Sequence, residues 1–176
     1  MQMDKGLDTG NMLLKKSCPI LAHDTAEILH DRLADVGAEA IVETLGQLES
    51  LNTEPQDDKL ATYAQKLSKE EAEIDWQQDA THIERLIRAF NPQPVAYTSI
   101  NEKALRIRDA TTIDHNSDSE PGRVIRCDKD GIDIACGNGT LRLLNLQPPG
   151  KKAMDVAAFY NGYPDMLKVD TMLGAK

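Results

Sequence analysis

An apolar stripe in the first third of the sequence constrains the fold more than any other feature. Such a stripe, at the spacing of one helical face, predicts an amphipathic helix that buries this face against a sheet or a core. Asp24 or Thr25 can cap the start of the helix, and we expect it to end near Ser50. Within residues 23–50 the stripe consists of Ile28, Leu29, Leu33, Val36, Ala40, Ile41, Leu45 and Leu48.

The sequence in front of this helix supplies little for the stripe to pack against. Residues 1–22 hold the turn GLDTG between two short segments, and they predict a strand, a turn and a second strand. Gly6 and Gly10 flank the turn, where they allow positive φ angles. One hairpin and one helix do not bury a core by themselves. We therefore expect residues 1–50 to be part of a larger domain, with Met1 as an internal or truncated start.

Residues 51–92 have the composition of a linker. The stretch 51–76 is polar, highly charged and only weakly periodic, which predicts a segment that crosses a surface. SKEE, at residues 68–71, combines a serine cap with acidic residues and predicts a helix start. Asn91-Pro92 ends a second predicted helix over residues 79–90. The buried face of that helix is predicted to hold Ile83, Leu86, Ile87 and Phe90.

From residue 93 onward the pattern changes to short strands. Asn, Asp, Gly and Pro turns separate the strands, and DKDG and GNG are hairpin signals. Short strands in this number predict a small barrel or sandwich. We expect a last helix over residues 153–162. The predicted class is therefore α+β, with a hairpin and a long helix, a linker helix and then a small β-barrel. The predicted strands are 95–100, 103–113, 122–128 and 131–146.

Charge limits the classes of function. The chain has 176 residues and a net charge of −9. The acidic excess lies in residues 1–90, whereas residues 91–176 carry as many basic as acidic side chains. An acidic total argues against a general nucleic-acid coat, but it leaves room for a local basic stripe in the second half.

Targeting signals and cysteine motifs are lacking in the sequence. No apolar run reaches the roughly 20 residues that cross a bilayer, and no signal-peptide pattern opens the chain. A cytoplasmic location without a membrane partner is therefore the default. The three cysteines form no CxxC pair, so we expect reduced thiols and no metal site.

Basic residues of the second half are candidates for binding phosphate. Arg106 and Arg108 are two residues apart on a predicted strand, so both point to one face of the sheet. Arg85 and Arg88 are three apart on the second helix and also share a face. These side chains are either solvated or form a phosphate track along an RNA, and their spacing leaves both possibilities open. The other candidates are Arg142, Lys151 and Lys152.

Five segments, in this order and at this spacing, resemble methionyl-tRNA formyltransferases: MQMDKGLDTGNML, DTAEILHDRLADVG, KLSKEEAEIDW, IRAFNP and LQPPGKKAM. The most specific part is SKEEAEIDW with IRAFNP downstream. GLDTG is shared more widely, by formyltransferases that use 10-formyltetrahydrofolate. The resemblance covers nearly the whole chain and becomes poor only after about Ala158.

The resemblance implies a two-domain enzyme that transfers a formyl group from 10-formyltetrahydrofolate to the amino group of initiator methionyl-tRNA. Residues 1–50 would be the C-terminal part of a Rossmann-like catalytic domain, and residues 51–92 a linker with its helix. Residues 93–176 would be a tRNA-binding β-barrel similar to an OB fold. No metal is implied, and we expect the full-length protein to be a monomer.

By the same resemblance, Asp8 matches the aspartate of a catalytic Asn, His and Asp set. The Asn and the His belong to an upstream segment beside an SLLP motif, and this sequence has neither. We therefore expect this chain by itself to be inactive. Judged without the resemblance, Asp8 is a turn aspartate that caps its own loop. The residues implied to border the folate pocket are Gly6, Leu7, Thr9 and Gly10.

The resemblance also favours the phosphate track, because it implies a basic channel on the inner side of the barrel. Two alternatives stay open. One is a stand-alone tRNA-binding module without chemistry. The other is a different 10-formyltetrahydrofolate-dependent formyltransferase, which acts on a sugar nucleotide or another amine. The SKEEAEIDW motif favours the methionyl-tRNA enzyme. The implied tRNA contacts are Arg85, Arg88, Arg106, Arg108, Arg142, Lys151 and Lys152.

Overall fold

The computed structural model describes residues 1–115 and 117–174. The chain forms two compact units, Met1–Lys66 and Leu67–Lys176. The predicted linker is divided between them: residues 51–66 belong to the first unit, and the second helix belongs to the second. The predicted division at residues 50 and 92 stays a prediction. Within the described residues, none of the helices combines the length and the apolar character that crossing a membrane requires.

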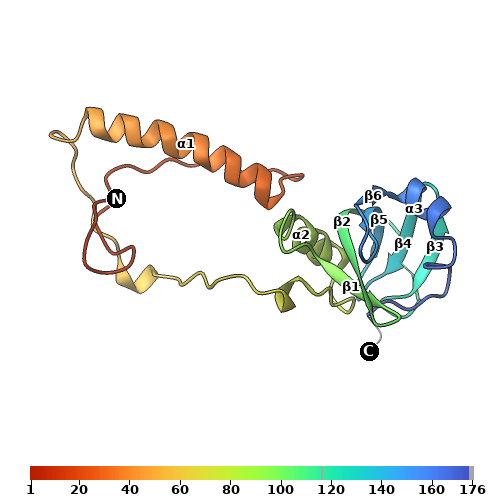
Figure 1. Cartoon of the computed structure of the whole chain (residues 1–176). Helices are drawn as coiled ribbons and strands as arrows, with labels where there is room; N and C mark the ends of the chain where they lie inside the picture. Colours follow the sequence, from red (N-terminus) through yellow and green to blue (C-terminus); the bar gives the residue numbers. More distant parts are fainter. Residues whose placement is uncertain (116, 175–176) are drawn as a thin grey trace. The chain divides into compact units, whose positions relative to one another are not determined.

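The first unit contains the predicted long helix. α1 spans Ala26–Gly46 (Figure 1), close to the predicted bounds. Thr25 is its N-cap, because its hydroxyl accepts a hydrogen bond from the backbone N–H of Ile28 at 3.3 Å. The neighbouring Asp24, the other predicted cap, instead binds the Arg32 guanidinium through two hydrogen bonds of 2.6 and 2.7 Å. A short 3₁₀ helix, η1, follows at Asp58–Leu60.

The apolar stripe of α1 is mostly open to solvent. The one buried residue of the helix is Thr44, whose hydroxyl donates to the Ala40 carbonyl at 2.7 Å. No sheet among the described residues of this unit covers the stripe. The expectation that residues 1–50 are part of a larger domain stays a prediction. The stripe residues that are about half exposed or more are Ile28, Leu33, Ile41, Leu45 and Leu48.

The predicted strands over residues 1–22 are wrong. In the described part of this segment, strand-like pairing is limited to one bridge, in which Met12 and Glu54 exchange backbone hydrogen bonds of 2.8 and 2.9 Å. A strand needs a partner for its whole row of backbone groups, and local apolar content does not provide one. The segment is instead held by ion pairs, from Lys15 to Glu54 at 2.6 Å and from Lys16 to Glu43 at 2.9 Å.

The second unit begins with the predicted SKEE cap. Ser68 and Glu71 form a reciprocal capping box: the Glu71 N–H donates to the Ser68 hydroxyl, and the Ser68 N–H donates to the Glu71 carboxylate. The box opens only a 3₁₀ turn, η2, at Glu70–Ala72. α2 follows at Ala80–Ala89 and agrees with the prediction. Its inner face holds Ile83 and Ile87, each 1% exposed.

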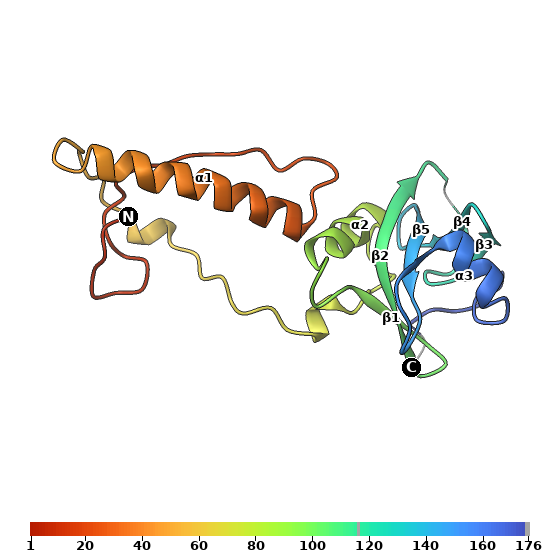
Figure 2. The same cartoon turned by 45° about the horizontal axis from the view of Figure 1, so that its top comes forward.

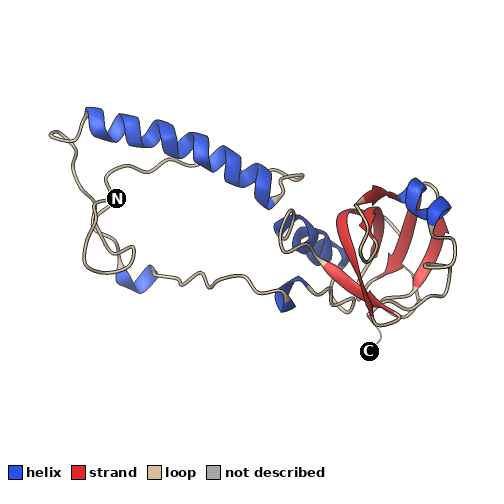
Figure 3. Ribbon diagram, in the orientation of Figure 1, coloured by secondary structure: helices blue, strands red, loops and turns tan. Residues whose placement is uncertain are grey.

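The predicted strands of the second half are confirmed as one curled antiparallel sheet, drawn in red in Figure 3. Neighbours pair in the order β1, β2, β5, β4, β3, and β6 pairs with β5. DKDG joins β3 to β4 and GNG joins β4 to β5, so both predicted hairpins are confirmed. The strands are β1 Tyr97–Ile100, β2 Lys103–Ile113, β3 Val124–Asp128, β4 Gly131–Ala135, β5 Thr140–Gln147 and β6 Met154–Asp155.

The core of this unit fills the inside of the curled sheet. Alternate residues of the strands point inward, and α2 packs against β2 and β5. α3, at Val156–Gly162, packs against β5 and β3 (Figure 2). It contributes the buried ring of Phe159. The α+β class and the barrel-like second unit are therefore confirmed. Fully buried strand residues include Leu105, Ile107, Ile132, Ile134, Leu141 and Leu143.

Residues 170–174 lie between the two outermost strands of the sheet. The N–H of Asp170 donates to the Val124 carbonyl, and the Val124 N–H donates to the Thr171 carbonyl, so the segment pairs with the start of β3. The N–H of Gly174 donates to the Ser99 carbonyl of β1 at 2.9 Å. Residues 170–174, here called the closing segment, thereby connect both edges of the sheet and leave Leu173 only 3% exposed.

Candidate active-site loop and nucleic-acid interface

The GLDTG loop is pinned by a glutamine that is distant in sequence. The ends of the loop meet where the Gln2 N–H donates to the Asn11 carbonyl at 2.9 Å. The side-chain amide of Gln56 donates to the carbonyls of Asp8 and Gly10 at 2.7 and 2.8 Å. The loop backbone is therefore fixed by hydrogen bonds that leave the Asp8 carboxylate out of the network.

The loop glycines have a different function from the one predicted. Asp8 itself has a positive φ of 54°, whereas Gly6 and Gly10 do not. Aspartate tolerates this left-handed conformation better than most residues do. Gly10 is needed for space, because a Cβ atom there would overlap with the Gln2 carbonyl oxygen. The loop thus uses its glycine for a close backbone approach, and the unusual backbone angle falls on the residue that carries the carboxylate.

The carboxylate of Asp8 faces solvent in the described structure. No side-chain hydrogen bond or ion pair to it occurs within residues 1–115 and 117–174. Leu7 and Thr9 are exposed beside it, and Leu7 keeps 78% of its surface open. A carboxylate in this setting can orient a histidine or accept a proton, but it supplies no oxyanion donor.

Two basic strand residues lie beside the turn after β5. Arg106 is exposed on β2 and lies opposite Gln147 of β5. Arg108 is half-buried, and its Nε and Nη2 donate to the Gln147 side-chain oxygen at 3.2 and 3.1 Å. Gln147 in turn donates to the carbonyl of Lys151 at 2.9 Å. The Gln147 side chain thus links Arg108 to the backbone of Lys151, which follows the turn.

A hollow of about 310 Å³ lies at this place, lined by Arg106, Gln147 and the Pro148–Gly150 turn. Lys103 also lines it and was missed in the sequence. Side chains alternate between the two faces of a strand, so Lys103 is predicted to share the inward face of the buried Leu105. It is nevertheless exposed, because it is the first residue of β2. We call the following residues the basic patch: Lys103, Arg106, Arg108, Lys151 and Lys152.

The end of α2 adjoins the same strand. The Asn91 side-chain amide donates to the Arg108 carbonyl at 3.1 Å, which fixes the C-terminal end of the helix beside β2. Arg85 on this helix is exposed. Arg88 is four-fifths buried, and its Nε lies 3.8 Å from the Glu84 carboxylate. Of the two predicted helix arginines, Arg85 is the more accessible to a partner.

Arg142 is engaged inside the protein. Its guanidinium donates two hydrogen bonds, of 2.6 and 2.8 Å, to the carboxylate of Asp133, which is 3% exposed. These bonds raise the pKa of Arg142 above its usual value. Arg142 is therefore not counted in the basic patch, because its guanidinium is already bonded to a carboxylate.

The cysteines are free thiols, as expected. Burial raises the pKa of Cys136 to about 12, and it also raises the pKa of Cys127. In the described residues, no three His, Cys, Asp or Glu side chains are grouped so that they could hold a metal ion.

Comparisons with known protein families give two matches along the chain. A family model described as "Formyl transferase, C-terminal domain" matches residues 66–164, and one described as "Formyl transferase" matches residues 1–45. The chain is 50% identical over 169 residues to the methionyl-tRNA formyltransferase of Marinobacter nauticus, covering 95% of this chain and 54% of that protein. It is 47% identical to that of Coxiella burnetii, with the same coverage. The chain thus spans about half the length of the curated relatives it matches.

Solved structures with similar folds are more distant in sequence. HypX from Aquifex aeolicus has a TM-score of 0.68 and 19% identity, over 95% of this chain and 31% of that one. A structure of that protein with tetrahydrofolic acid gives the same TM-score. WlaRD, a sugar 3N-formyl transferase, has a TM-score of 0.56 and 21% identity, over 85% and 53%. At these identities the likeness concerns the fold alone.

Proposed function

The chain belongs to the formyl transferase family, and from this membership we propose that it is part of a methionyl-tRNA formyltransferase. The observation that carries the proposal is the 47–50% identity to such enzymes over 95% of the chain. The reaction takes a formyl group from 10-formyltetrahydrofolate. The amine nitrogen of methionyl-tRNA bonds to the formyl carbon, the bond from that carbon to the folate nitrogen breaks, and the proton lost by the amine ends on the folate nitrogen.

In this proposal the GLDTG loop supplies the aspartate of the catalytic set. The attack produces a tetrahedral oxyanion, which needs hydrogen-bond donors such as a histidine and an asparagine. Asp8 orients the histidine and favours its charged form. The exposed carboxylate and the pinned backbone of the loop support this role. The rest of the loop, Gly6, Leu7, Thr9 and Gly10, borders the folate.

The second unit holds the tRNA in this proposal. Phosphate contacts come from the basic patch, in which Lys103, Arg106, Lys151 and Lys152 are exposed and Arg108 is half-buried, and from the exposed Arg85 of α2. Arg88 supports them from the same helix face. Arg142 supports the tRNA-binding surface mainly by its ion pair with Asp133, since its guanidinium is already bonded to that carboxylate. The same proposal assigns three roles along the chain: part of the catalytic domain to residues 1–50, a linker to residues 51–92 and a tRNA-binding barrel to residues 93–176.

A gel-shift titration of the 176-residue chain with initiator tRNA across a salt series tests the tRNA-binding part. We expect binding that weakens as salt rises, because phosphate contacts release counterions. The triple variant Arg106→Ala, Lys151→Ala, Lys152→Ala should bind more weakly, with a salt slope smaller by about three. The matched control neutralises three exposed lysines of the first unit, Lys5, Lys59 and Lys66, and should bind as the parent chain does. Lack of binding at the lowest salt would contradict the proposal.

The catalytic part is tested with 10-formyltetrahydrofolate and charged initiator tRNA. By the resemblance, Asp8 is one member of a set whose Asn and His this sequence lacks. We therefore expect no formyl transfer above background from the 176-residue chain, even where it binds the tRNA. Formylmethionyl-tRNA formed by the purified chain would contradict the assignment of the catalytic set.

A further inference from the structure

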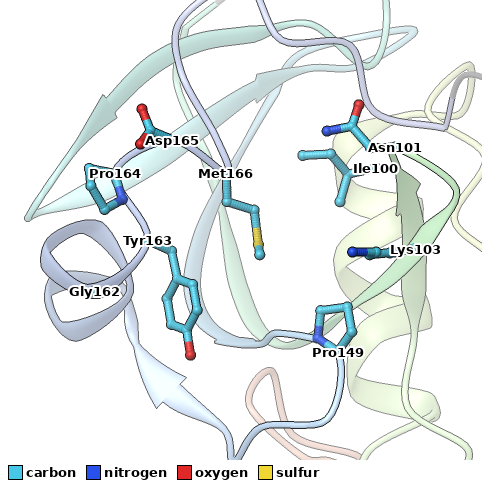
Figure 4. A pocket seen from close by; sticks show the side chains of 9 residues that line it. All are labelled: Ile100, Asn101, Lys103, Pro149, Gly162, Tyr163, Pro164, Asp165 and Met166. Carbon is cyan, nitrogen blue, oxygen red and sulfur yellow. The ribbon is translucent and has the colours of Figure 1, made fainter.

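A cavity of about 390 Å³ lies beside the basic patch (Figure 4). Its walls come from the turn between β1 and β2, the Pro148–Gly150 turn and the chain that follows α3. The volume falls in the range of small-ligand pockets, roughly 300–1,000 Å³. We call it the Tyr163 pocket, and the residues used below are Ile100, Asn101, Lys103, Pro149, Tyr163 and Met166.

One wall of the pocket is a fixed aromatic ring. Tyr163 stacks on the buried ring of Phe159, with centroids 5.5 Å apart and planes inclined by 27°. Its backbone is also tied, since its N–H donates to the Phe159 carbonyl and its own carbonyl accepts from Met166. Figure 4 shows the Tyr163 ring and the Met166 side chain facing the cavity. The pocket therefore offers a preformed flat apolar surface, which loses little entropy when a ligand stacks on it.

The opposite wall carries a positive charge. Lys103 points its amino group toward the cavity in Figure 4, and no ion pair to it occurs among the described residues. The one acid of the lining, Asp165, is paired with Lys168 at 2.8 Å, and this contact lowers the pKa of its carboxyl. Asn101, in a left-handed turn with φ of 47°, adds an amide at the rim. The pocket thus combines apolar walls with one cation that forms no ion pair within the described part of the chain.

The Tyr163 pocket adjoins the hollow of the basic patch, because Lys103 and Pro149 line both. Arg106 lies in that hollow and extends the positive charge away from the ring. A ligand that fits both has a flat aromatic part for the pocket and an anionic group for the hollow. A nucleotide has this combination, with a base that stacks on an aromatic ring and a phosphate that lies on Lys or Arg.

We propose that the Tyr163 pocket binds the base of one unpaired nucleotide of the bound tRNA, with a phosphate beside that base on Lys103 and Arg106. This inference rests on the proposed function and assigns a specific site on the RNA-binding unit. We assign the nucleotide to the RNA because the pocket lies beside the basic patch. The patch carries more positive charges than the phosphate of one mononucleotide would contact. A free mononucleotide is the competing source, and the experiment separates the two.

The variant Tyr163→Leu keeps an apolar side chain and removes the ring. We expect it to lower the affinity for initiator tRNA by about tenfold or more, the size of a lost base-aromatic stack, while the salt slope stays unchanged. Tyr163→Phe retains the ring and should bind within about twofold of the parent. Lys103→Ala should weaken binding and reduce the salt slope by about one. Tyr160→Leu, on the exposed side of α3, is the matched control and should have no effect.

A second measurement uses the unmodified chain, so it does not depend on how the variants fold. Ultraviolet crosslinking to bound tRNA, followed by trypsin digestion and mass spectrometry, should place a nucleotide on Tyr163 within the peptide 153–168. A crosslink found only elsewhere, or a Tyr163→Leu variant that folds and binds like the parent, would overturn the pocket. AMP at millimolar concentration should not displace the tRNA; displacement would assign the site to free nucleotides. Failure of the parent chain to bind any tRNA would instead overturn the proposed function itself.

Discussion

Arg142 on β5 donates two hydrogen bonds, of 2.6 and 2.8 Å, to the buried carboxylate of Asp133 on β4. The residues lie opposite each other in the register of the two strands, so the pair ties the centre of the sheet together. Arg126 on β3 lies near the same carboxylate, at 3.9 Å, and also bonds to Asp128 at 2.6 Å. The hydrogen bonds to the Asp133 carboxylate thus come chiefly from the Arg142 guanidinium.

Removing that guanidinium should destabilise the second unit. Arg142→Ala leaves a buried charge with only a distant partner, and we expect the free energy of unfolding to fall by about 2–3 kcal/mol, less than for fully buried pairs because the Arg142 side chain is one-quarter exposed. Urea unfolding followed by the fluorescence of Trp76, the single tryptophan, measures the change. Arg85→Ala is the control. A loss below about 0.5 kcal/mol, typical of surface changes, would contradict a structural role for Arg142.

The closing segment should contribute to stability in the same unit. Leu173→Ala removes a side chain that is 3% exposed, and we expect a loss of about 2–4 kcal/mol from the lost burial and the cavity. Val169→Ala, at a residue 53% exposed, is the matched control and should cost little. If both variants unfold at the same urea concentration as the parent, the closing segment does not pack as described.

Gln56 should hold the GLDTG loop in place. Gln56→Ala removes both hydrogen bonds to the loop carbonyls, so we expect faster tryptic cleavage after Lys5. Gln65→Ala is a suitable control because it changes an exposed glutamine at another point of the same unit. The initial rate of appearance of the shortened chain, measured by mass spectrometry, gives the comparison. Equal rates for the two variants would show that the amide does not restrain the loop.

Cys136 should resist thiol reagents in the folded chain. Its pKa is raised to about 12 by burial, so at pH 8 almost none of it is the reactive thiolate. Because the shift is upward, reactivity should increase only as the pH rises toward that value. Peptide mapping after maleimide treatment should find Cys136 unlabelled at pH 8 and labelled in denaturant. Labelling of Cys136 at the rate of an exposed thiol would mean that the strand end opens readily.

Local signals in the sequence were sufficient for much of the second unit. The face formed by Ile83 and Ile87 follows from helical spacing, and the DKDG and GNG hairpins follow from turn chemistry that acts over a few residues. The predicted strands over residues 1–22 were wrong because strand formation depends on a distant partner. The break between the strands at residues 101–102 was predicted correctly, but not its conformation, since Asn101 and Glu102 are non-glycine residues with positive φ angles.

The candidate sites show the same division between local and distant information. Asp8 was found through its motif, whereas Gln56, which pins its loop, lies 48 residues away and has no pattern of its own. Asp133 and Arg142 come together only through the register of β4 and β5, so spacing alone could not separate Arg142 from the accessible arginines. Tyr163 follows a short helix, and its place beside Lys103 depends on how the turns meet.

In the part of the chain that the structure describes, the buried residues of the hydrophobic core all come from the segment Ala72–Leu173. The two halves of the chain therefore have different sources of cohesion, apolar packing in one and polar tethers in the other. Warming should produce two separate melting events, of which the barrel gives the sharper. A protease that removes the front half should leave a resistant remnant with its tryptophan still shielded.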